Sequence, residues 1–488
     1  MFVIARKNMY YRIVTLLLIS MILFGLHGTH AHAATTTVAC SISGTFTITD
    51  NVVTGQNDCA GSASIPAEVT SIGEGAFLGA SALTGITIPA GVTSIGANSF
   101  RGASALTTVT FADGSQLTSI GVGAFQNATA LTAITIPAEV TSIGDYAFNN
   151  AGNIATVTFA AGSKLISIGV GTFYRASALT AITIPAEVTS IGDYAFNNAS
   201  SLTTVTFAAG SKLISIGQTA FGGASALTAI TIPAGVTSIG NYAFWGTSSL
   251  VTVTFGAGSQ LTSIGGSAFR NATALTAITI PAGVTSIEAS AFENASALKS
   301  VYFLANKPTI ASNAFSGVTG ATAYIRSTAS GYPAVGSPLN GLTVAVGVYD
   351  LTYVTYGGSA IATGVVLQGQ PISAPTPPTR SRDTFVGWSA SVGGSTLTFP
   401  YLPSTAGNVI LHAKWLVATP TRTATRTATR NTARTATRTA TRNTARTATR
   451  TATRTRTRTA TRTRTRTTTR TLTRTPTRTP VRTATPTP

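Results

Sequence analysis

The sequence predicts a mainly β protein, built as a solenoid of about 11 coils with parallel strands and followed by a small β domain and a disordered tail. The first observation is a phenylalanine that recurs eleven times, at spacings that alternate between 23 and 25 residues. An isoleucine precedes each of them by five residues, and the composition changes to Thr, Arg, Ala and Pro after Val417. The phenylalanines expected in the repeat core are Phe77, Phe100, Phe125, Phe148, Phe173, Phe196, Phe221, Phe244, Phe269, Phe292 and Phe315.

Residues 1–33 are predicted to be a signal peptide that exports the rest of the chain. Arg6 and Lys7 provide the positive start, residues 13–26 are apolar, and Ala31-His32-Ala33 offers small residues for cleavage before Ala34. The apolar segment is short for a membrane-spanning helix, and an uncleaved anchor is the alternative. In either case the body is expected to be extracellular or at the cell surface, with no membrane span after cleavage.

The two cysteines of the exported chain, Cys40 and Cys59, are expected to form a disulfide. Closing this loop would stabilise the fold by about 3 kcal/mol in the chain-entropy model. The alternative is a metal pair, but His412 is the one histidine left after the signal peptide. Residues 34–64 are interpreted as a hairpin that caps the solenoid, with this disulfide holding it over the first coil.

The solenoid is predicted over residues 65–325, and one unit shows how each coil is built. The unit begins with a short strand of alternating apolar residues, which Pro185 ends because proline cannot donate to a β-ladder. A second extended edge follows, then a turn at Gly192 and a short helical or irregular segment. The side chains expected to face inward are Leu179, Ile182, Ile184, Val188, Ile191 and Phe196.

Every second coil carries two extra residues, which explains the alternating spacing. In the unit ending at Phe221 they lie around Gly210-Ser211, a turn signal, so a loop is expected at one corner. The unit of duplication is therefore 48 residues. A single coil cannot offset the entropy of ordering its backbone, so the coils must stack and share one core.

The repeated phrase LTxITIPxxVTSIGxxAFxxxxxL resembles the BspA-like, or bacterial surface antigen, type of leucine-rich repeat over about residues 60–325. The family often has cysteine three residues after the phenylalanine, where this chain has alanine, as at Ala80 and Ala103. The resemblance implies a leucine-rich-repeat solenoid on a cell-surface protein that binds other proteins, adheres to cells or aggregates them. It implies no catalysis.

A linker is predicted at residues 326–343 and a second domain at 344–416. The segments Val354-Thr355-Tyr356-Gly357-Gly358, Phe385-Val386-Gly387-Trp388 and Leu411-His412-Ala413-Lys414-Trp415 resemble the internalin B-repeat, or Listeria–Bacteroides repeat. This resemblance implies a small β-grasp-like module that acts as a spacer on bacterial surface proteins. Phe385, Trp388 and Trp415 are expected to form its core.

Residues 417–488 are predicted to be a disordered Thr/Arg/Pro-rich tail, because they have no aromatic residue and no acid. The tail holds 18 of the 32 basic residues and accounts for the net charge of +19. It is interpreted as a passive tether, as a ligand for an anionic envelope polymer, or as a glycosylated stalk. Nucleic-acid binding is not expected, since no aromatic side chains interleave with the arginines.

The sequence offers no pattern of catalytic or metal-binding residues, so no enzyme activity, metal or cofactor is expected. A nucleophile–histidine pair would have to use His412, and no metal-ligand spacing of histidine and cysteine occurs. Glu139 and Glu187 recur at the 48-residue interval, which marks copied surface positions rather than one acid–base pair.

Two surfaces of the solenoid are candidates for binding. Rows of outward threonines, such as Thr183 and Thr206, follow the strands, and threonine there suits an exposed sheet. The other surface is the edge beside the phenylalanines, where aromatic residues recur at the 48-residue interval. The candidate partner-binding residues are Tyr146, Tyr194, Tyr242, Trp245, Tyr174 and Arg175.

The function predicted from these features is a secreted or cell-surface adhesion and interaction protein that uses the solenoid as a multivalent surface. Its partner is expected to be an extracellular protein or glycan. The first alternative is a structural surface-layer or matrix component without a specific partner. A minor alternative is an ice-binding solenoid that uses the threonine rows.

Overall fold

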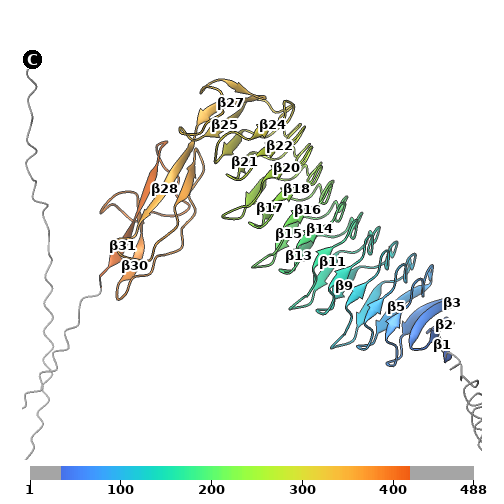
Figure 1. Cartoon of the computed structure of the whole chain (residues 1–488). Helices are drawn as coiled ribbons and strands as arrows, with labels where there is room; N and C mark the ends of the chain where they lie inside the picture. Colours follow the sequence, from blue (N-terminus) through green and yellow to red (C-terminus); the bar gives the residue numbers. More distant parts are fainter. Residues whose placement is uncertain (1–33, 418–488) are drawn as a thin grey trace, which may run out of the picture. The chain divides into compact units, whose positions relative to one another are not determined.

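The computed structural model describes residues 34–417, so the predicted signal peptide and all but the first residue of the predicted tail lie outside the described residues. The described chain consists of strands and turns, and no helix occurs between residues 34 and 417 (Figure 1). The predicted all-β solenoid with parallel strands is confirmed.

The N-terminal cap is a meander of three antiparallel strands, β1 (Thr35–Ala39), β2 (Ser43–Thr49) and β3 (Val52–Ser64). The predicted hairpin therefore has a third strand. Cys40 and Cys59 form a disulfide, with their Cα atoms 5.5 Å apart. The buried ring of Phe46 lies 5.6 Å from that of Phe77, so the cap packs on the first repeat phenylalanine. Strand β3 continues into both solenoid ladders, because it pairs in parallel with β4 (Ser71–Ile72) and β5 (Leu83–Ile88).

The first ladder consists of two-residue strands, one from each coil, paired in parallel and in register. Each ends on the isoleucine that lies five residues before the phenylalanine. After β4 the members are β6 (Ser94–Ile95), β8 (Ser119–Ile120), β10 (Ser142–Ile143), β12 (Ser167–Ile168), β14 (Ser190–Ile191), β16 (Ser215–Ile216), β18 (Ser238–Ile239), β20 (Ser263–Ile264), β22 (Ser286–Ile287) and β24 (Thr309–Ile310).

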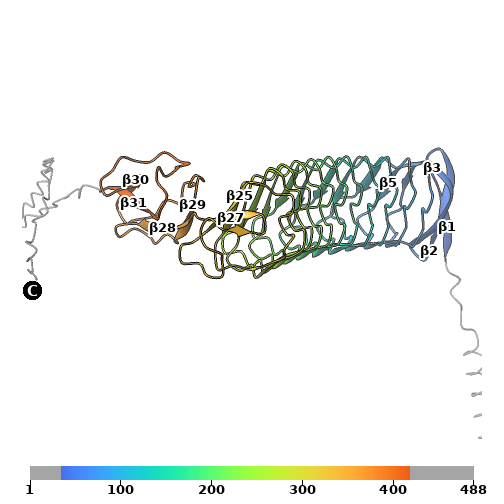
Figure 2. The same cartoon turned by 90° about the horizontal axis from the view of Figure 1, so that it is seen from above.

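The second ladder consists of the longer strands, which follow the phenylalanine turns. β5 pairs with β7 (Thr108–Phe111), and the pairing is interrupted between β7 and the next strand. It resumes through β9 (Ala133–Ile136), β11 (Thr156–Phe159), β13 (Ala181–Ile184), β15 (Thr204–Phe207), β17 (Ala229–Ile232), β19 (Thr252–Phe255), β21 (Ala277–Ile280), β23 (Ser300–Phe303), β25 (Ala321–Ile325) and β27 (Leu342–Val346). Figure 2 shows the coils following one another in series.

The solenoid extends beyond the last repeat phenylalanine, to about 13 coils rather than about 11. β25 pairs with β27 in parallel, and β26 (Pro338–Leu339) closes the ladder antiparallel to β27. The segment 326–343 therefore contains β26 and the start of β27, where the sequence predicted a linker. Val344, which the prediction assigned to the second domain, is buried in the solenoid core.

One continuous hydrophobic core runs through the solenoid. The six side chains expected to face inward in the unit around Phe196 are each at most 3% exposed. The eleven repeat phenylalanines form a column in which neighbouring rings are nearly parallel, with centroids 5.0 to 5.4 Å apart. Each ring thus contacts the coil before it and the coil after it, which is how coils that are too small to fold alone share a core.

A column of glycines follows the isoleucine column, and the reason is close approach of the backbone. A Cβ atom on Gly192 would lie 2.7 Å from the carbonyl carbon of Gly169 in the preceding coil. We expect Gly192→Ala to lower the free energy of unfolding by about 1–3 kcal/mol, because it overpacks this contact. Urea denaturation followed by circular dichroism measures the effect.

The control is Gly152→Ala, since a Cβ there would meet nothing closer than 3.6 Å. Equal unfolding midpoints for the two variants would show that the glycine column is not needed for stacking.

The second domain is a four-stranded mixed sheet in the order β29-β28-β31-β30. Its strands are β28 (Val348–Val354), β29 (Gly364–Leu367), β30 (Thr384–Ser389) and β31 (Val409–Leu416), with β28 and β31 parallel and the other pairs antiparallel. This domain has a hydrophobic core separate from that of the solenoid, and Trp388 is buried in it. Phe385 packs edge-on against both Trp388 and Trp415. These are the three aromatic residues expected in that core.

Candidate functional site

The edge of the solenoid beside the phenylalanine column, here called the turn edge, comprises the three residues on each side of every repeat phenylalanine. Alternate residues of this segment donate backbone hydrogen bonds to the next coil. In one coil Tyr146 donates to Val170 (2.7 Å) and Phe148 donates to Thr172 (2.9 Å). Backbone hydrogen bonds therefore join the turn edges of successive coils, much as they join the strands of a sheet, although the backbone of the turn edge is not extended.

This bonding pattern requires left-handed backbone at two positions in each coil. The position two residues before the phenylalanine has positive φ in ten coils, and the position two residues after it has positive φ in all eleven. Left-handed backbone favours glycine and asparagine. The residues before the phenylalanine are Gly75, Asn98, Gly123, Tyr146, Gly171, Tyr194, Thr219, Tyr242, Ser267 and Ser290.

Three of the candidate aromatic residues occupy this left-handed position. Tyr146, Tyr194 and Tyr242 have φ of 58°, 59° and 59°. A bulky side chain there is rare and costs about 1 kcal/mol. Their side chains are 41%, 36% and 41% exposed, so core packing does not explain them. Stability alone would favour glycine or asparagine here, as most other coils have.

The ring of Tyr146 lies against the next coil. A Cβ on Gly171 would be 2.5 Å from Cε1 of Tyr146, so this ring crosses the backbone of the following coil. Thr219 and Ser267 hold the same turn position after Tyr194 and Tyr242, and both are buried. Because each of them has a Cβ there, the rings of Tyr194 and Tyr242 lie in a different place from that of Tyr146. We infer that the Tyr146 ring has one side against the protein and the other toward solvent.

The remaining candidates lie on the same edge. Trp245 is 39% exposed and follows Phe244, in the coil of Tyr242. Arg175 has φ of 59° and is the one residue other than glycine or asparagine at the left-handed position after the phenylalanine. Its guanidinium lies 5.2 Å from the ring centroid of Tyr174, a cation–π contact. All six candidate residues therefore lie on the turn edge. Trp245 shares a coil with Tyr242, and Arg175 shares a coil with Tyr174.

The tyrosines occur in every second coil at equivalent positions. The strands of neighbouring coils pair in register, and the phenylalanine rings of this region are 5.2 to 5.4 Å apart. Two coils therefore separate successive tyrosines by roughly 10 Å along the solenoid. A partner with its own repeat at that distance would meet them in series.

Three hollows that the repeat pattern did not predict lie on the opposite corner of the coils. The two extra residues of alternate coils form protruding loops, and a hollow lies between successive loops. The hollows have volumes of 690, 580 and 560 Å³ and recur at the 48-residue interval. The first is lined by Thr110, Phe111, Gln116, Thr135, Pro137 and Glu139.

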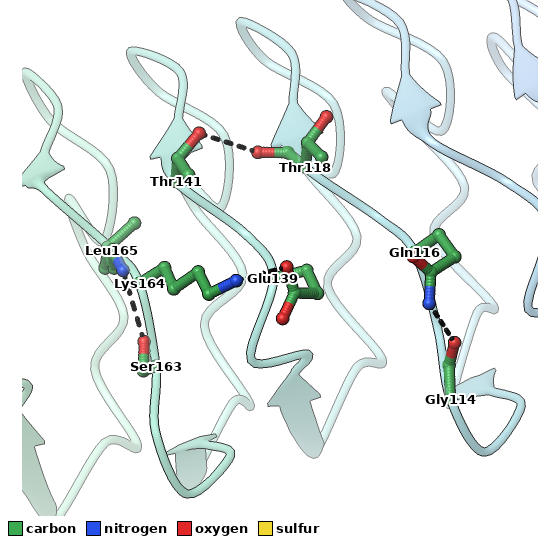
Figure 3. Close-up of polar contacts among 8 residues, drawn as sticks. All are labelled: Gly114, Gln116, Thr118, Glu139, Thr141, Ser163, Lys164 and Leu165. Atoms are coloured by element: carbon green, nitrogen blue, oxygen red, sulfur yellow. Dashed lines mark hydrogen bonds and ion pairs between the residues drawn. The ribbon is translucent and has the colours of Figure 1, made fainter.

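Ion pairs join the coils at two of these hollows. Lys164 lies 2.6 Å from Glu139 (Figure 3), and Lys212 lies 2.6 Å from Glu187, each pair linking neighbouring coils. The recurring glutamates are thus surface positions that pair with lysine. All four side chains are at least 40% exposed, so each pair contributes less than about 1 kcal/mol.

The predicted threonine rows do point outward. Thr158 lies opposite Thr135, and Thr183 lies opposite Thr206, on the exposed face of the second ladder. The hollows adjoin this face, since Thr110 and Thr135 line the first of them. The threonine surface is therefore bordered by protruding loops rather than being flat throughout.

Titratable groups do not gather at any of these places. Within residues 34–417, no group of three or more His, Cys, Asp and Glu side chains is arranged to hold a metal ion. Burial raises the pKa of Tyr332 and of Tyr353, and neither residue lies on the turn edge. Nδ1 of His412 lies 2.9 Å from the Tyr356 hydroxyl, in the second domain. No helix in the described part is long and apolar enough to cross a membrane.

Solved structures similar to this chain include the following three. A leucine-rich repeat protein from Bacteroides ovatus is 23% identical, with 60% of this chain and 92% of that chain covered and a TM-score of 0.36. A leucine rich cell surface protein from Faecalibacterium prausnitzii is 26% identical, with 61% and 95% covered and a TM-score of 0.33. The pneumococcal vaccine antigen PcpA is 19% identical, with 60% and 94% covered and a TM-score of 0.39. A search of curated proteins gives no match.

Family models match both folded parts of the chain. The Listeria-Bacteroides repeat domain matches residues 349–414. The model described as a BspA type leucine rich repeat region of six copies matches residues 48–167, 93–226, 166–255 and 208–322, which together exceed half of the chain. Neither is a catalytic family, and BspA-type proteins are typically found at the cell surface. The chain belongs to the BspA-type leucine-rich repeat family.

Proposed function

We propose that the protein is a secreted or cell-surface adhesion protein that binds an extracellular partner along the turn edge of its solenoid. Membership of the BspA-type family supports a surface interaction role. The repeat offers the same contact several times, so weak contacts add up to useful avidity. The basic tail would serve to hold the protein to an anionic envelope polymer, an interaction that salt would weaken.

The observation that carries this proposal is the left-handed backbone of Tyr146, Tyr194 and Tyr242. Residues kept in an unfavourable backbone conformation concentrate at functional sites, because something other than stability maintains them. Tyrosine is also among the side chains that dominate binding interfaces. The exposed Trp245 adds a second such anchor beside Tyr242.

The threonine rows support ice binding less well. The loops that border the hollows protrude beside these rows, so a flat crystal plane would meet the loops as well as the threonines. A structural component without a specific partner would need no aromatic residues in left-handed backbone. The turn edge therefore favours a binding role over both alternatives.

We expect the triple variant Tyr146→Asn, Tyr194→Asn, Tyr242→Asn to lose binding and keep its stability. Asparagine tolerates left-handed backbone, as Asn98 does at the same position, so the unfolding midpoint should stay the same or rise. Loss of three aromatic anchors should weaken binding at least about tenfold. The measurement is saturable binding of the full-length protein to an array of extracellular-matrix proteins and polysaccharides.

The matched control replaces Ile166 and Ile214 by asparagine, since these residues are also exposed and also lie 48 residues apart, on another face. This control should bind as the wild type does. Absence of saturable binding by the wild type, or equal binding by the triple variant, would refute the proposed function of the turn edge.

A further inference from the structure

We propose that Tyr146, Tyr194 and Tyr242, here called the tyrosine ladder, bind an extended β-1,4-linked glycan, with one sugar stacked on each ring. This inference rests on the proposed function and names the class of partner. It follows from the spacing of the rings, from their orientation and from the uncharged amide side chains around them.

The spacing fits a polymer whose repeat is a disaccharide. In a β-1,4-linked chain each sugar is turned over relative to the one before it, so the same face recurs at every second sugar. That repeat is close to the length of two coils, which is roughly 10 Å from the spacing of paired strands. The tyrosines also recur in every second coil, so each disaccharide would bring an equivalent sugar face to the next ring.

The orientation of the rings suits stacking. The ring of Tyr146 lies against the backbone at Gly171. Thr219 and Ser267 have a Cβ at the equivalent position, so the rings of Tyr194 and Tyr242 lie in a different place, but they are exposed to a similar extent (36% and 41%, against 41% for Tyr146). A ring that lies along the surface offers one face to a ligand. Aromatic faces are electron-rich and attract the polarised C–H groups on the flat face of a pyranose. Stacking also needs little conformational ordering, because the rings are already held against the protein.

Amide side chains on the same edge can meet the hydroxyl groups of the sugar. Nε2 of Gln218 donates to the Tyr194 hydroxyl (3.2 Å), and the exposed Asn198 donates to the side-chain oxygen of the buried Asn197 (3.0 Å). Asn150 donates in the same way to Asn127 in the preceding coil (3.0 Å). Such neutral groups both donate and accept, as a polyhydroxyl ligand requires.

The charges beside the ladder argue for a neutral glycan. Asp145 and Asp193 precede the first two tyrosines, and each accepts a backbone hydrogen bond from the next coil, from Val170 (2.8 Å) and from Gln218 (2.7 Å). These carboxylates would repel an anionic polymer. On the turn edge, Arg175 already lies over the Tyr174 ring, and Arg270 pairs with Glu293 at 3.1 Å. A neutral chain such as a cello- or chito-oligosaccharide therefore fits better than an acidic one.

The test is titration calorimetry of the full-length protein with cello- and chito-oligosaccharides of two, four and six sugars, and with dextran as an α-linked control. Six sugars span three disaccharide repeats and so reach all three rings. We expect affinity for at least one series to rise at least about tenfold from disaccharide to hexasaccharide. Dextran should not bind.

The triple variant Tyr146→Asn, Tyr194→Asn, Tyr242→Asn should lose the dependence on length, and the Ile166→Asn, Ile214→Asn control should keep it. The inference is overturned by absent binding, by equal affinity for all lengths or by an unaffected triple variant. If the array identifies a protein partner that the triple variant fails to bind, the proposed function stands and the glycan inference fails.

Discussion

Phe196→Ala is expected to lower the free energy of unfolding by about 3–5 kcal/mol, the largest effect of any single change considered for this chain. The ring is fully buried and lies between those of Phe173 and Phe221, with centroids 5.4 and 5.2 Å away. The coils cannot close the gap, because backbone bonds fix their spacing; Phe196 itself donates to Ala220 at 2.7 Å. Truncation therefore leaves a cavity that both neighbouring coils line.

Urea denaturation measures this loss, and the shape of the transition adds information. Stability in a solenoid depends on contacts between neighbouring units, so a defect at Phe196 should separate the unfolding of the coils on its two sides. Phe196→Leu is the control, since it keeps most of the apolar volume and should cost much less. A loss below about 1 kcal/mol for the alanine variant would contradict a core shared between coils.

Replacing both Cys40 and Cys59 by serine is expected to cost about 3 kcal/mol, the second large effect. The disulfide closes a loop with a sequence separation of 19 and holds β3, which begins both ladders. Without it the cap should open locally. Hydrogen exchange should therefore increase in β1, β2 and β3, and should remain unchanged in the coils near Phe292.

Reduction of the wild type with dithiothreitol provides the control, because it should reproduce the behaviour of the double serine variant. If the oxidised wild type and the variant show the same exchange in the cap, the disulfide is not what holds the cap to the first coil.

The fold was predictable from the sequence because each coil repeats the same few buried residues. The spacing of Phe196 and its equivalents predicts the stacked core, and the alternation of Ile182 and Ile184 with small residues predicts the longer strands. Near the C-terminal end of the solenoid the repeated sequence phrase is no longer present, but the second ladder of strands continues. There Tyr302 and Tyr324 stack at 5.0 Å, and β27 pairs without any phenylalanine turn, so periodicity alone placed the boundary too early.

The candidate site was predictable only in part. Tyr146 and Trp245 stand out in the sequence as large residues at a recurring edge. The left-handed backbone of Tyr146 was not anticipated, although Gly75, Asn98 and Gly123 at the same position are a signal for it. The hollows between corner loops depend on contacts between segments 25 residues apart, such as Glu139 with Lys164, which the pattern of one unit does not reveal.

The central claim, that the tyrosine ladder is the binding surface, can be tested by shortening the solenoid in phase. Deletion of residues 147–194 joins Tyr146 to Ala195 and removes one ladder tyrosine with two coils. Deletion of residues 76–123 joins Gly75 to Ala124, removes the same length and keeps all three tyrosines. Both junctions restore the repeat phrase, so both proteins should fold.

The decisive measurement is the dissociation constant of each shortened protein for the partner that the wild type binds on the array. We expect the 76–123 deletion to bind as the wild type does, and the 147–194 deletion to bind at least about tenfold more weakly, because one of three linked contacts is lost. Equal affinities for the two shortened proteins would contradict binding through the tyrosine ladder.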